Sequence, residues 1–393
     1  MRRPIAKSRL VQMMVVIAAL SAGITGCSSG GDGDTAASGT GPIVIGGLLD
    51  ETGAAAPYGT AALRGAQIAF AQVNGKGGVK GRTIELRQSD GGFDVAQSTG
   101  ILQRYAADDD IVAVIGPNSD TVSIPLTERI NRAKLVAVQT SGSTARTKEE
   151  YGQWLFSVPV RNRALIEQVS NELAARDLKR VAVVYATSRA FAVTAKDDFL
   201  KAAAASGLSI VGKPIGYNDA DVDFSTVVTT LRSSGQVDAV FCSCLPPAAG
   251  PMIAQSSDAG MKAVWASDAS LLDPTFYKLS KSKGEGTLVA TPFSPTREDA
   301  VVKQFMTDYK AKFGDDPNLY AAYGYDAALA VVRAIESVNG EITRDAVRAA
   351  MGKVSFEGAT GTISFPDGQG AAARQTVFLV EMHDGTFTPV KAS

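Results

Sequence analysis

The chain has 393 residues, of which 45% are hydrophobic, and its formal net charge is −1. This length and composition allow two folded domains, while the lack of a basic run or patch excludes nucleic acid as an expected partner. With one histidine and no H-E-x-x-H motif, the chain is not expected to be an enzyme or to hold a metal or cofactor.

The N-terminus carries the pattern of an export signal. Basic residues within the first nine positions precede a mostly apolar stretch, Leu10 to Leu20, which is too short to span a bilayer comfortably. It ends in Ile24-Thr25-Gly26-Cys27, which resembles the bacterial lipobox. We therefore expect residues 1–26 to be a lipoprotein signal peptide and Cys27 to carry a lipid that anchors the protein to the outer face of the cell membrane.

Residues 27–41 predict a flexible, lipid-anchored tether. After the cysteine, this segment contains nothing larger than aspartate. It cannot bury enough apolar surface to offset the entropy lost on ordering, so the folded part is expected to begin at about Pro42.

From there the sequence alternates short apolar runs with segments of helical periodicity. Strands of a buried parallel sheet are predicted at 43–49, 83–86, 111–115 and 135–138, and again at 180–185, 208–212, 237–241 and 263–265. Between them, residues such as Leu63, Ala66 and Phe70 recur at helical spacing. Two such series predict two doubly wound α/β lobes, with ligands at the carboxyl ends of the strands.

The C-terminal third departs from this alternation. Helices are predicted at 298–313, 318–338 and 343–351, followed by strands at 358–365 and 375–381. We expect this segment to return to the lobes that the earlier residues have already built.

Two cysteines remain besides Cys27. Cys242 and Cys244 lie two apart in a strand-like run, where side chains point the same way and a disulfide would be strained. We expect buried, inert thiols.

Several motifs, in order along the chain, resemble the branched-chain amino-acid-binding proteins, which are type I periplasmic binding proteins of ABC transporters. They are Thr52-Gly53, Tyr58-Gly59, Arg64-Gly65-Ala66, Val73 to Gly81, Ile115-Gly116-Pro117, Gln139 to Ser143, Val264-Trp265 with Asp268, Tyr323 to Asp326, and Gly361 to Phe365. The resemblance implies two lobes joined by a three-crossing hinge that closes like a clamshell. It places residues 42–160 and 291–363 in the N-terminal lobe and residues 161–290 and 364–393 in the C-terminal lobe.

The resemblance also implies the ligand contacts. Ser141 and Ser143 would hold an amino-acid carboxylate, Asp268 would bind its ammonium group, and Tyr58 would line the side-chain pocket. The turn at 118–121 would contribute donors, because it opens a predicted helix. The complete set of candidate ligand-binding residues is Tyr58, Ser119, Asp120, Ser141, Gly142, Ser143, Phe191 and Asp268.

The sequence departs from the family pattern at some of these places. Asp120 stands where the family usually has a carboxylate-binding serine, and an acid there either repels a ligand carboxylate or caps the helix. Ala190 stands where an aromatic residue usually contacts the ligand, although Phe191 is adjacent.

The sequence thus predicts a monomeric solute-binding lipoprotein that captures a small, branched-chain or aliphatic amino acid for an ABC transporter permease. Two alternatives stay open. The same fold could bind another small molecule, such as an amide, urea or aromatic acid, or it could serve as a sensory lipoprotein that is not coupled to transport.

Overall fold

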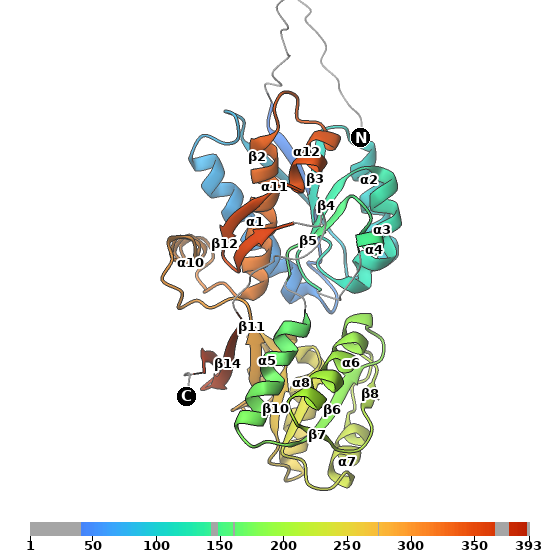
Figure 1. Cartoon of the computed structure of the whole chain (residues 1–393). Helices are drawn as coiled ribbons and strands as arrows, with labels where there is room; N and C mark the ends of the chain where they lie inside the picture. Colours follow the sequence, from blue (N-terminus) through green and yellow to red (C-terminus); the bar gives the residue numbers. More distant parts are fainter. Residues whose placement is uncertain (1–40, 143–147, 160–161, 274, 366–376, 391–393) are drawn as a thin grey trace, which may run out of the picture. The chain divides into compact units, whose positions relative to one another are not determined.

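The computed structural model describes residues 41–142, 148–159, 162–273, 275–365 and 377–390 (Figure 1). The expected signal peptide, the lipidated Cys27 and nearly all of the tether lie outside these residues. Within the described ranges, no helix combines the length and the apolar character needed to cross a membrane.

The first sheet has five parallel strands in the order β2-β1-β3-β4-β5. All but β2 are buried along their whole length, as the continuous apolar runs of the sequence predict. The strands are β1 (Ile43–Leu49), β2 (Ile84–Asp90), β3 (Ile111–Ile115), β4 (Val136–Gln139) and β5 (Leu155–Ser157).

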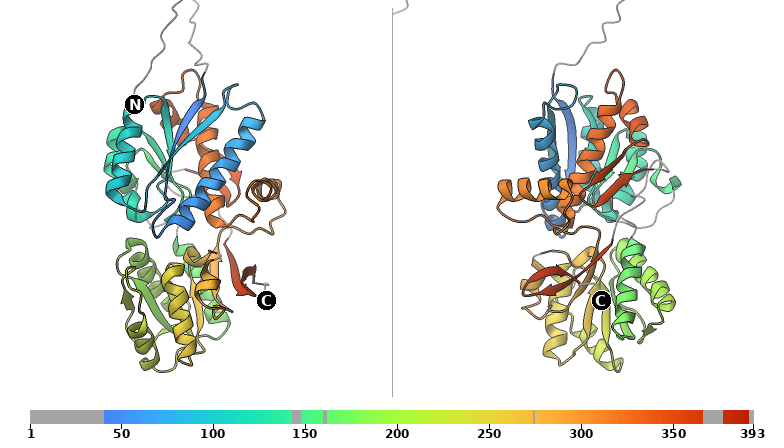
Figure 2. Two further views of the ribbon diagram at one scale, coloured as in Figure 1. Left: turned by 180° about the vertical axis from the view of Figure 1, so that it is seen from behind. Right: turned by 60° about the vertical axis from the view of Figure 1, so that its left-hand side comes forward.

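Helices from both ends of the chain cover this first sheet. α1 and α11 pack on one side of the sheet, and α2 and α3 pack on the other (Figures 1 and 2). The C-terminal helices therefore return to the lobe that the N-terminal residues build. The helices are α1 (Ala56–Gly75), α2 (Val95–Ala107), α3 (Asp120–Ala133), α4 (Lys148–Tyr151), α10 (Ala300–Phe313), α11 (Leu319–Ser337) and α12 (Arg344–Met351).

The second sheet has eight strands, in the order β15-β14-β11-β10-β9-β6-β7, with β8 also paired to β6. Its strands are β6 (Arg180–Ala186), β7 (Ser209–Ile210), β8 (Ile215–Tyr217), β9 (Ala239–Ser243), β10 (Val264–Ser267), β11 (Leu288–Thr291), β14 (Phe378–His383) and β15 (Thr386–Pro389). Strands β6 to β11 pair in parallel, whereas β14 and β15 add an antiparallel edge.

Alternate residues of the central strands face two separate apolar cores. Val181 and Val183 of β6 pack with α5 and α6, while Ala182 and Val184 pack with α7 and α8. Since successive side chains of a strand point to opposite faces, this division shows a sheet covered on both sides. The helices are α5 (Asn162–Ala175), α6 (Ala190–Ala205), α7 (Ser225–Ser233), α8 (Pro246–Asp258) and α9 (Thr275–Leu279), with a short 3₁₀ helix, η1 (Ala269–Leu271), after β10.

Three predicted strands differ from the structure. The run at 208–212 contains only the two-residue β7. The run at 358–365 is half of a hairpin formed by β12 (Ser355–Gly358) and β13 (Gly361–Ser364). The run at 375–381 is displaced, since β14 spans Phe378–His383. Strands β5, β8, β11 and β15 were not predicted from the sequence. Each has only three or four residues, which is too few to show a strand pattern.

Asp326 of α11 fixes the turn of the β12–β13 hairpin. Its carboxylate accepts hydrogen bonds from the backbone N–H groups of Ala359 (2.6 Å) and Thr360 (2.9 Å) and from the Thr360 hydroxyl (2.6 Å). Burial raises the pKa of this carboxyl to about 6, although the three donors oppose the shift. The Asp326 motif noted in the sequence therefore has a structural role, which joins a helix of the first lobe to the hairpin.

Helices α1 and α11 approach so closely that two glycines are required between them. A Cβ atom on Gly65 would lie 1.8 Å from the carbonyl oxygen of Ala321, and one on Gly324 would lie 2.0 Å from that of Ala62. The backbones would have to separate to admit a methyl group. This contact matters for function, because the two helices carry Tyr58 and Tyr320.

We predict that Gly65→Ala lowers the free energy of unfolding by about 1–3 kcal/mol, because it forces these two helices apart. Chemical denaturation monitored by circular dichroism measures the loss. Gly75→Ala is the matched control, since Gly75 ends the same helix with no atom within 4 Å of a Cβ placed there. An equal effect of both substitutions would contradict a close-packing role.

Candidate functional site

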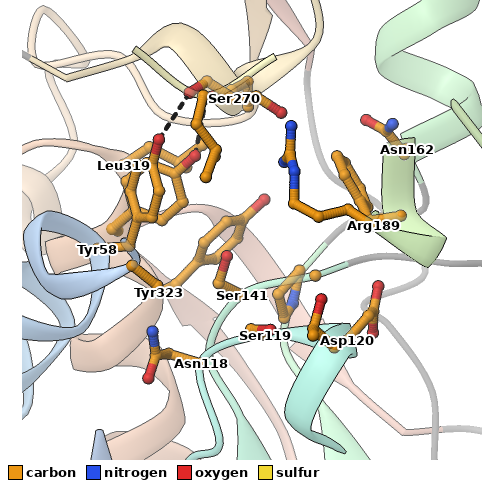
Figure 3. A pocket seen from close by; sticks show the side chains of 18 of the residues that line it. Tyr58, Asn118, Ser119, Asp120, Ser141, Asn162, Arg189, Ser270, Leu319 and Tyr323 are labelled. Atoms are coloured by element: carbon orange, nitrogen blue, oxygen red, sulfur yellow. Dashed lines mark hydrogen bonds between the residues drawn. The ribbon is translucent and has the colours of Figure 1, made fainter. Parts of the chain in front are cut away.

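A pocket of about 670 Å³, which includes space open to solvent, is lined by residues of both lobes (Figure 3). Both sheets contribute loops that follow the carboxyl ends of their parallel strands, as the doubly wound pattern predicts. The lining comprises Ala55, Tyr58, Phe93, Asn118, Ser119, Asp120, Thr121, Ser141, Gly142, Pro159, Asn162, Leu165, Arg189, Phe191, Leu245, Ala269, Ser270, Leu319, Tyr320 and Tyr323.

Helix N-termini converge on this pocket. The N-cap residues of α3, α6 and α8, which are Ser119, Arg189 and Leu245, all belong to the lining. None of the three caps its helix with a side-chain hydrogen bond, whereas α2, α10, α11 and α12 are capped in this way. The first N–H groups of a helix and its dipole both favour acceptors and negative charge. The uncapped ends thus make the pocket suitable for an acidic or carbonyl-bearing ligand.

Two tyrosines of the first lobe hold the 3₁₀ helix of the second. The Tyr58 hydroxyl donates to the carbonyl oxygen of Ser270 (3.0 Å), and the Tyr320 hydroxyl donates to that of Ala269 (2.9 Å). The two rings pack with centroids 4.3 Å apart. Burial raises the pKa of both hydroxyls well above its usual value, so both remain neutral donors. Because these hydroxyls already donate to the protein, the rings serve the pocket as apolar walls.

The floor of the pocket is built around Asn118. Its Oδ1 atom accepts a hydrogen bond from the backbone N–H of Asp50 (2.9 Å), and the Asp50 carboxylate accepts one from the N–H of Phe93 (2.8 Å). These bonds tie the ends of β1, β2 and β3 together. Asn118 is only 2% exposed, and among the described residues its Nδ2 atom has no hydrogen-bond partner. A buried donor without an acceptor in the protein is costly unless a ligand or water satisfies it.

Asp120 lies in the first turn of α3 and is not the helix cap, because Ser119 takes that position. The Asp120 carboxylate accepts a hydrogen bond from Gln139 Nε2 (2.7 Å). Gly142 sits against it with φ of +87°, and a Cβ there would lie 2.6 Å from the Asp120 carboxyl carbon. Only glycine fits this turn, which brings Ser141 and Gly142 beside the start of α3. The sequence left two roles open for Asp120, ligand contact or helix cap. Because Ser119 is the N-cap residue of α3, the capping role is wrong.

Asp268 does not line the pocket. Its side chain is fully buried at the start of η1, where Oδ2 accepts hydrogen bonds from Asn162 Nδ2 (3.0 Å) and the Ser243 hydroxyl (2.9 Å). Its Oδ1 accepts a bond from the backbone N–H of Ser270 (2.9 Å). This acid therefore fixes the loop that Tyr58 and Tyr320 contact.

Arg189 brings a positive charge into the pocket from the second lobe. Its side chain is 6% exposed and forms an ion pair with Asp219, with Nε 2.9 Å from Oδ2. Its Nη2 donates to the carbonyl oxygen of Ser243 (3.2 Å). Asp219 is held in turn by the Ser188 hydroxyl (2.8 Å). The guanidinium is thus fixed by its neighbours and stays charged.

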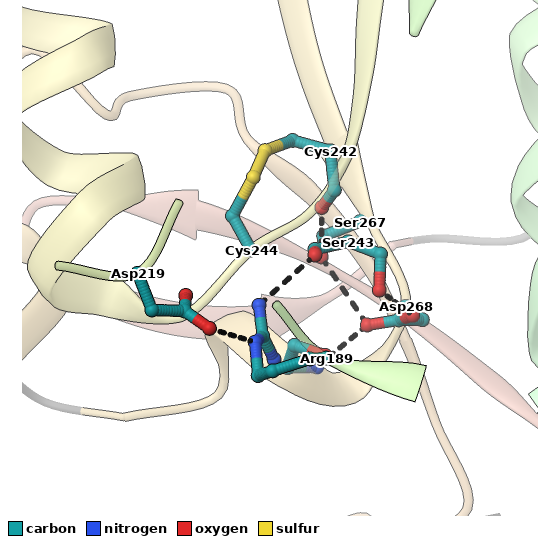
Figure 4. The surroundings of a disulfide bond; sticks show 8 residues. Arg189, Asp219, Cys242, Ser243, Cys244, Ser267 and Asp268 are labelled. Carbon is teal, nitrogen blue, oxygen red and sulfur yellow. Dashed lines mark hydrogen bonds and ion pairs between the residues drawn. A yellow bond between two sulfur atoms is a disulfide. The ribbon is translucent and has the colours of Figure 1, made fainter. Parts of the chain in front are cut away.

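Cys242 and Cys244 form a disulfide, which corrects the expectation of two free thiols (Figure 4). Their Cα atoms lie 5.3 Å apart, within the range that a disulfide spans. The expectation assumed that both residues lie in one strand, but β9 ends at Ser243 and Cys244 lies beyond it. The rule that side chains two residues apart in a strand point the same way therefore does not apply to Cys244.

The structure brings most of the candidate ligand-binding residues together. Tyr58, Ser119, Asp120, Ser141, Gly142 and Phe191 line one pocket, whereas Asp268 lies behind it and Ser143 lies outside the described residues. Sequence reasoning missed Arg189 and Tyr320, placed Asn118 only within the contributing 118–121 turn, and gave Tyr323 no ligand contact. Arg189 follows the predicted strand at 180–185 and directly precedes α6, so a basic residue just after a strand was the available signal. Within the described ranges, no three His, Cys, Asp or Glu side chains could hold a metal ion.

Comparisons with known proteins agree with this architecture. The sequence profile described as periplasmic binding protein matches residues 42–386. An amino acid binding protein from Pseudomonas aeruginosa is 28% identical over 328 residues, which are 78% of this chain and 81% of that protein.

Two solved structures share the fold at low identity. The substrate-binding protein of a branched-chain amino acid transporter from Streptococcus pneumoniae, in complex with isoleucine, is 22% identical with a TM-score of 0.81, over 89% of this chain and 100% of the other. A solute-binding protein of an ABC transporter from R. palustris, in complex with benzoate, is 19% identical with a TM-score of 0.78, over 89% and 96% of the two chains.

We predict that Asp268→Ala lowers the unfolding free energy of the ligand-free protein by about 2–4 kcal/mol, because Asn162, Ser243 and the Ser270 N–H lose their common acceptor. Denaturant titration without any solute measures this loss. Asp197→Ala is the control, since that carboxylate is half exposed on α6 and pairs only with its neighbour Lys196. Unchanged stability of the Asp268 variant would show that the carboxylate is not needed to hold the loop.

Proposed function

Since the chain belongs to the periplasmic binding protein family, we propose that it is an extracytoplasmic lipoprotein that captures a small amino acid and delivers it to the permease of an ABC importer. The observation that carries this proposal is the pocket itself, which residues of both lobes line at the carboxyl ends of their strands. The family and the two-lobed type I fold are those of solute-binding proteins and not of enzymes.

Closure of the two lobes on the solute is the mechanism that this arrangement supports. A ligand that contacts Ser141 on one side and Arg189 on the other makes all of its contacts only when the lobes are together. Binding then shifts the equilibrium toward the closed state by the difference in affinity. A permease can recognise the loaded protein by its closed shape.

The relative from P. aeruginosa, which is named an amino acid binding protein, supports an amino acid as the first candidate. One observation favours a second candidate, a small carboxylic acid without an amine. The Asp268 carboxylate, which the family resemblance assigns to the ammonium group, already accepts hydrogen bonds from Asn162, Ser243 and Ser270. The fold does not choose between them, because one structural neighbour was solved with isoleucine and another with benzoate.

We expect a broad solute screen by thermal shift to find a ligand that stabilises the protein by RT ln(1 + [L]/Kd), which is several kcal/mol at saturation. Aliphatic amino acids, aromatic acids, amides and urea form the panel. The ligand should also lower the radius of gyration in small-angle scattering, and deletion of the gene should abolish its uptake. A sensory role would leave uptake intact, and a scattering profile unchanged at saturation would rule out closure.

The lipid anchor has a separate test. Cys27→Ser should move the protein from the membrane fraction into the soluble fraction, because the serine cannot carry the thioether-linked lipid. Immunoblotting of the fractions measures the change, and a Ser28 to alanine substitution serves as the control. Retention of the Cys27 variant in the membrane would place the anchor elsewhere.

A further inference from the structure

We propose that the pocket binds the acidic group of its solute through Arg189 of the second lobe, which reverses the polarity expected from the family resemblance. That resemblance puts the carboxylate on the segment from 119 to 143 and an ammonium group on Asp268. This inference rests on the proposed solute-binding function and specifies the solute as a carboxylate with an apolar body.

The charges in the pocket lining carry the first step. Asp120 and Arg189 are the charged side chains among the described residues that line it. Asp120 belongs to the first lobe and accepts a hydrogen bond from Gln139, so a carboxylate beside it would meet a like charge. Arg189 lies across the pocket from Asn118 and Ser119 (Figure 3). A solute carboxylate is therefore repelled on one side and attracted on the other.

The hydrogen bonds of Arg189 leave room for such a ligand. The bonds to Asp219 and to the Ser243 carbonyl use one N–H each from Nε and Nη2, and the Tyr217 hydroxyl is a further neighbour, so some of the five N–H donors of the guanidinium stay available. Both partners lie within the second lobe, and they fix the plane of the group before any ligand arrives. An arginine held in this way binds a carboxylate with strong, charge-assisted hydrogen bonds at little cost in side-chain entropy.

Two further features fit an anion at this position. Arg189 is the N-cap residue of the sixteen-residue helix α6, and it makes no side-chain bond to its own helix. The positive end of that helix therefore adds to the field of the guanidinium. On the floor of the pocket, the buried Asn118 Nδ2 has no partner of hydrogen-bond geometry among the described residues and provides another donor. Arg189 and Asn118 thus both offer donors to the pocket, which calls for acceptors on the solute.

The rest of the lining describes the body of the solute. Phe93, Phe191 and Leu245 contribute apolar surface, and the rings of Tyr58 and Tyr320 add to it because their hydroxyls are bound to backbone carbonyls. Such walls stabilise an aliphatic or aromatic group by burial. The chemistry of the site therefore points to a monocarboxylate with a branched aliphatic or aromatic body.

The test compares carboxylates with their neutral amides. Calorimetric titration measures L-leucine, 4-methylpentanoate and benzoate against L-leucinamide, 4-methylpentanamide and benzamide, on the wild type and on Arg189→Gln. The wild type should bind at least one carboxylate about ten to a hundred times more tightly than its amide, and Arg189→Gln should abolish that preference while changing amide binding little. Arg163→Gln is the control, since Arg163 is exposed on α5 and pairs with Glu167.

Three results would overturn the inference: equal binding of carboxylate and amide by the wild type, a preference that survives in Arg189→Gln, or no binding of any carboxylate. If Arg189→Gln does not fold, Asp219→Asn provides the test, because it releases the guanidinium without removing its charge and should reduce the carboxylate preference several-fold. An unchanged preference in that variant would also count against the inference. A neutral solute that binds and closes the lobes in the broad screen would leave the proposed function standing while this inference fails.

Discussion

Parallel strands impose the constraint on which the rest of this structure depends. Each strand must be followed by a crossover before the next can pair with it, so the carboxyl ends of all the strands in a sheet meet at one edge. Helices start from the same edge, with their N–H groups unpaired. In this protein both sheets turn such an edge toward one pocket, where Ser119, Arg189 and Leu245 begin their helices without capping them.

Two tyrosine hydroxyls make directional contacts between the lobes among the described residues. Tyr58 and Tyr320 of the first lobe donate to the carbonyl oxygens at 270 and 269, and Asp268 holds that same short helix from behind. Hydrogen bonds of this kind contribute about 0.5–1.5 kcal/mol each. In the proposed closure mechanism, a solute with contacts on both sides of the pocket adds its differential binding energy to these contacts. The close packing of α1 on α11 supports this region, because those helices carry the two tyrosines.

The electrostatics of the pocket depend on which charged groups the fold places there, more than on the overall charge of the chain. The whole chain is nearly neutral, yet the pocket contains one guanidinium, several helix N-termini and a carboxylate that already accepts a hydrogen bond. Asp268 does not line the pocket, and its carboxylate accepts hydrogen bonds from the protein. Arg189 lines the pocket and is held in place by Asp219. Asp268, which the sequence put forward as a ligand contact, thus stabilises the fold, whereas Arg189, which the sequence did not single out, lines the pocket.

The sequence by itself determined the architecture, because short continuous apolar runs such as Ile43–Leu49 alternate with helical repeats such as Leu63, Ala66 and Phe70, and this alternation is typical of parallel α/β sheets. The family resemblance, carried by the sequence, also pointed to Tyr58, Ser119, Asp120, Ser141, Gly142 and Phe191, which line the pocket. Tertiary structure decided what local spacing cannot encode. The partners of Asp268 lie 25 and 106 residues away, and Tyr58 contacts a carbonyl 212 residues away. The pairing of Cys242 with Cys244 likewise depended on where β9 ends, which short strands leave undefined until their neighbours are in place.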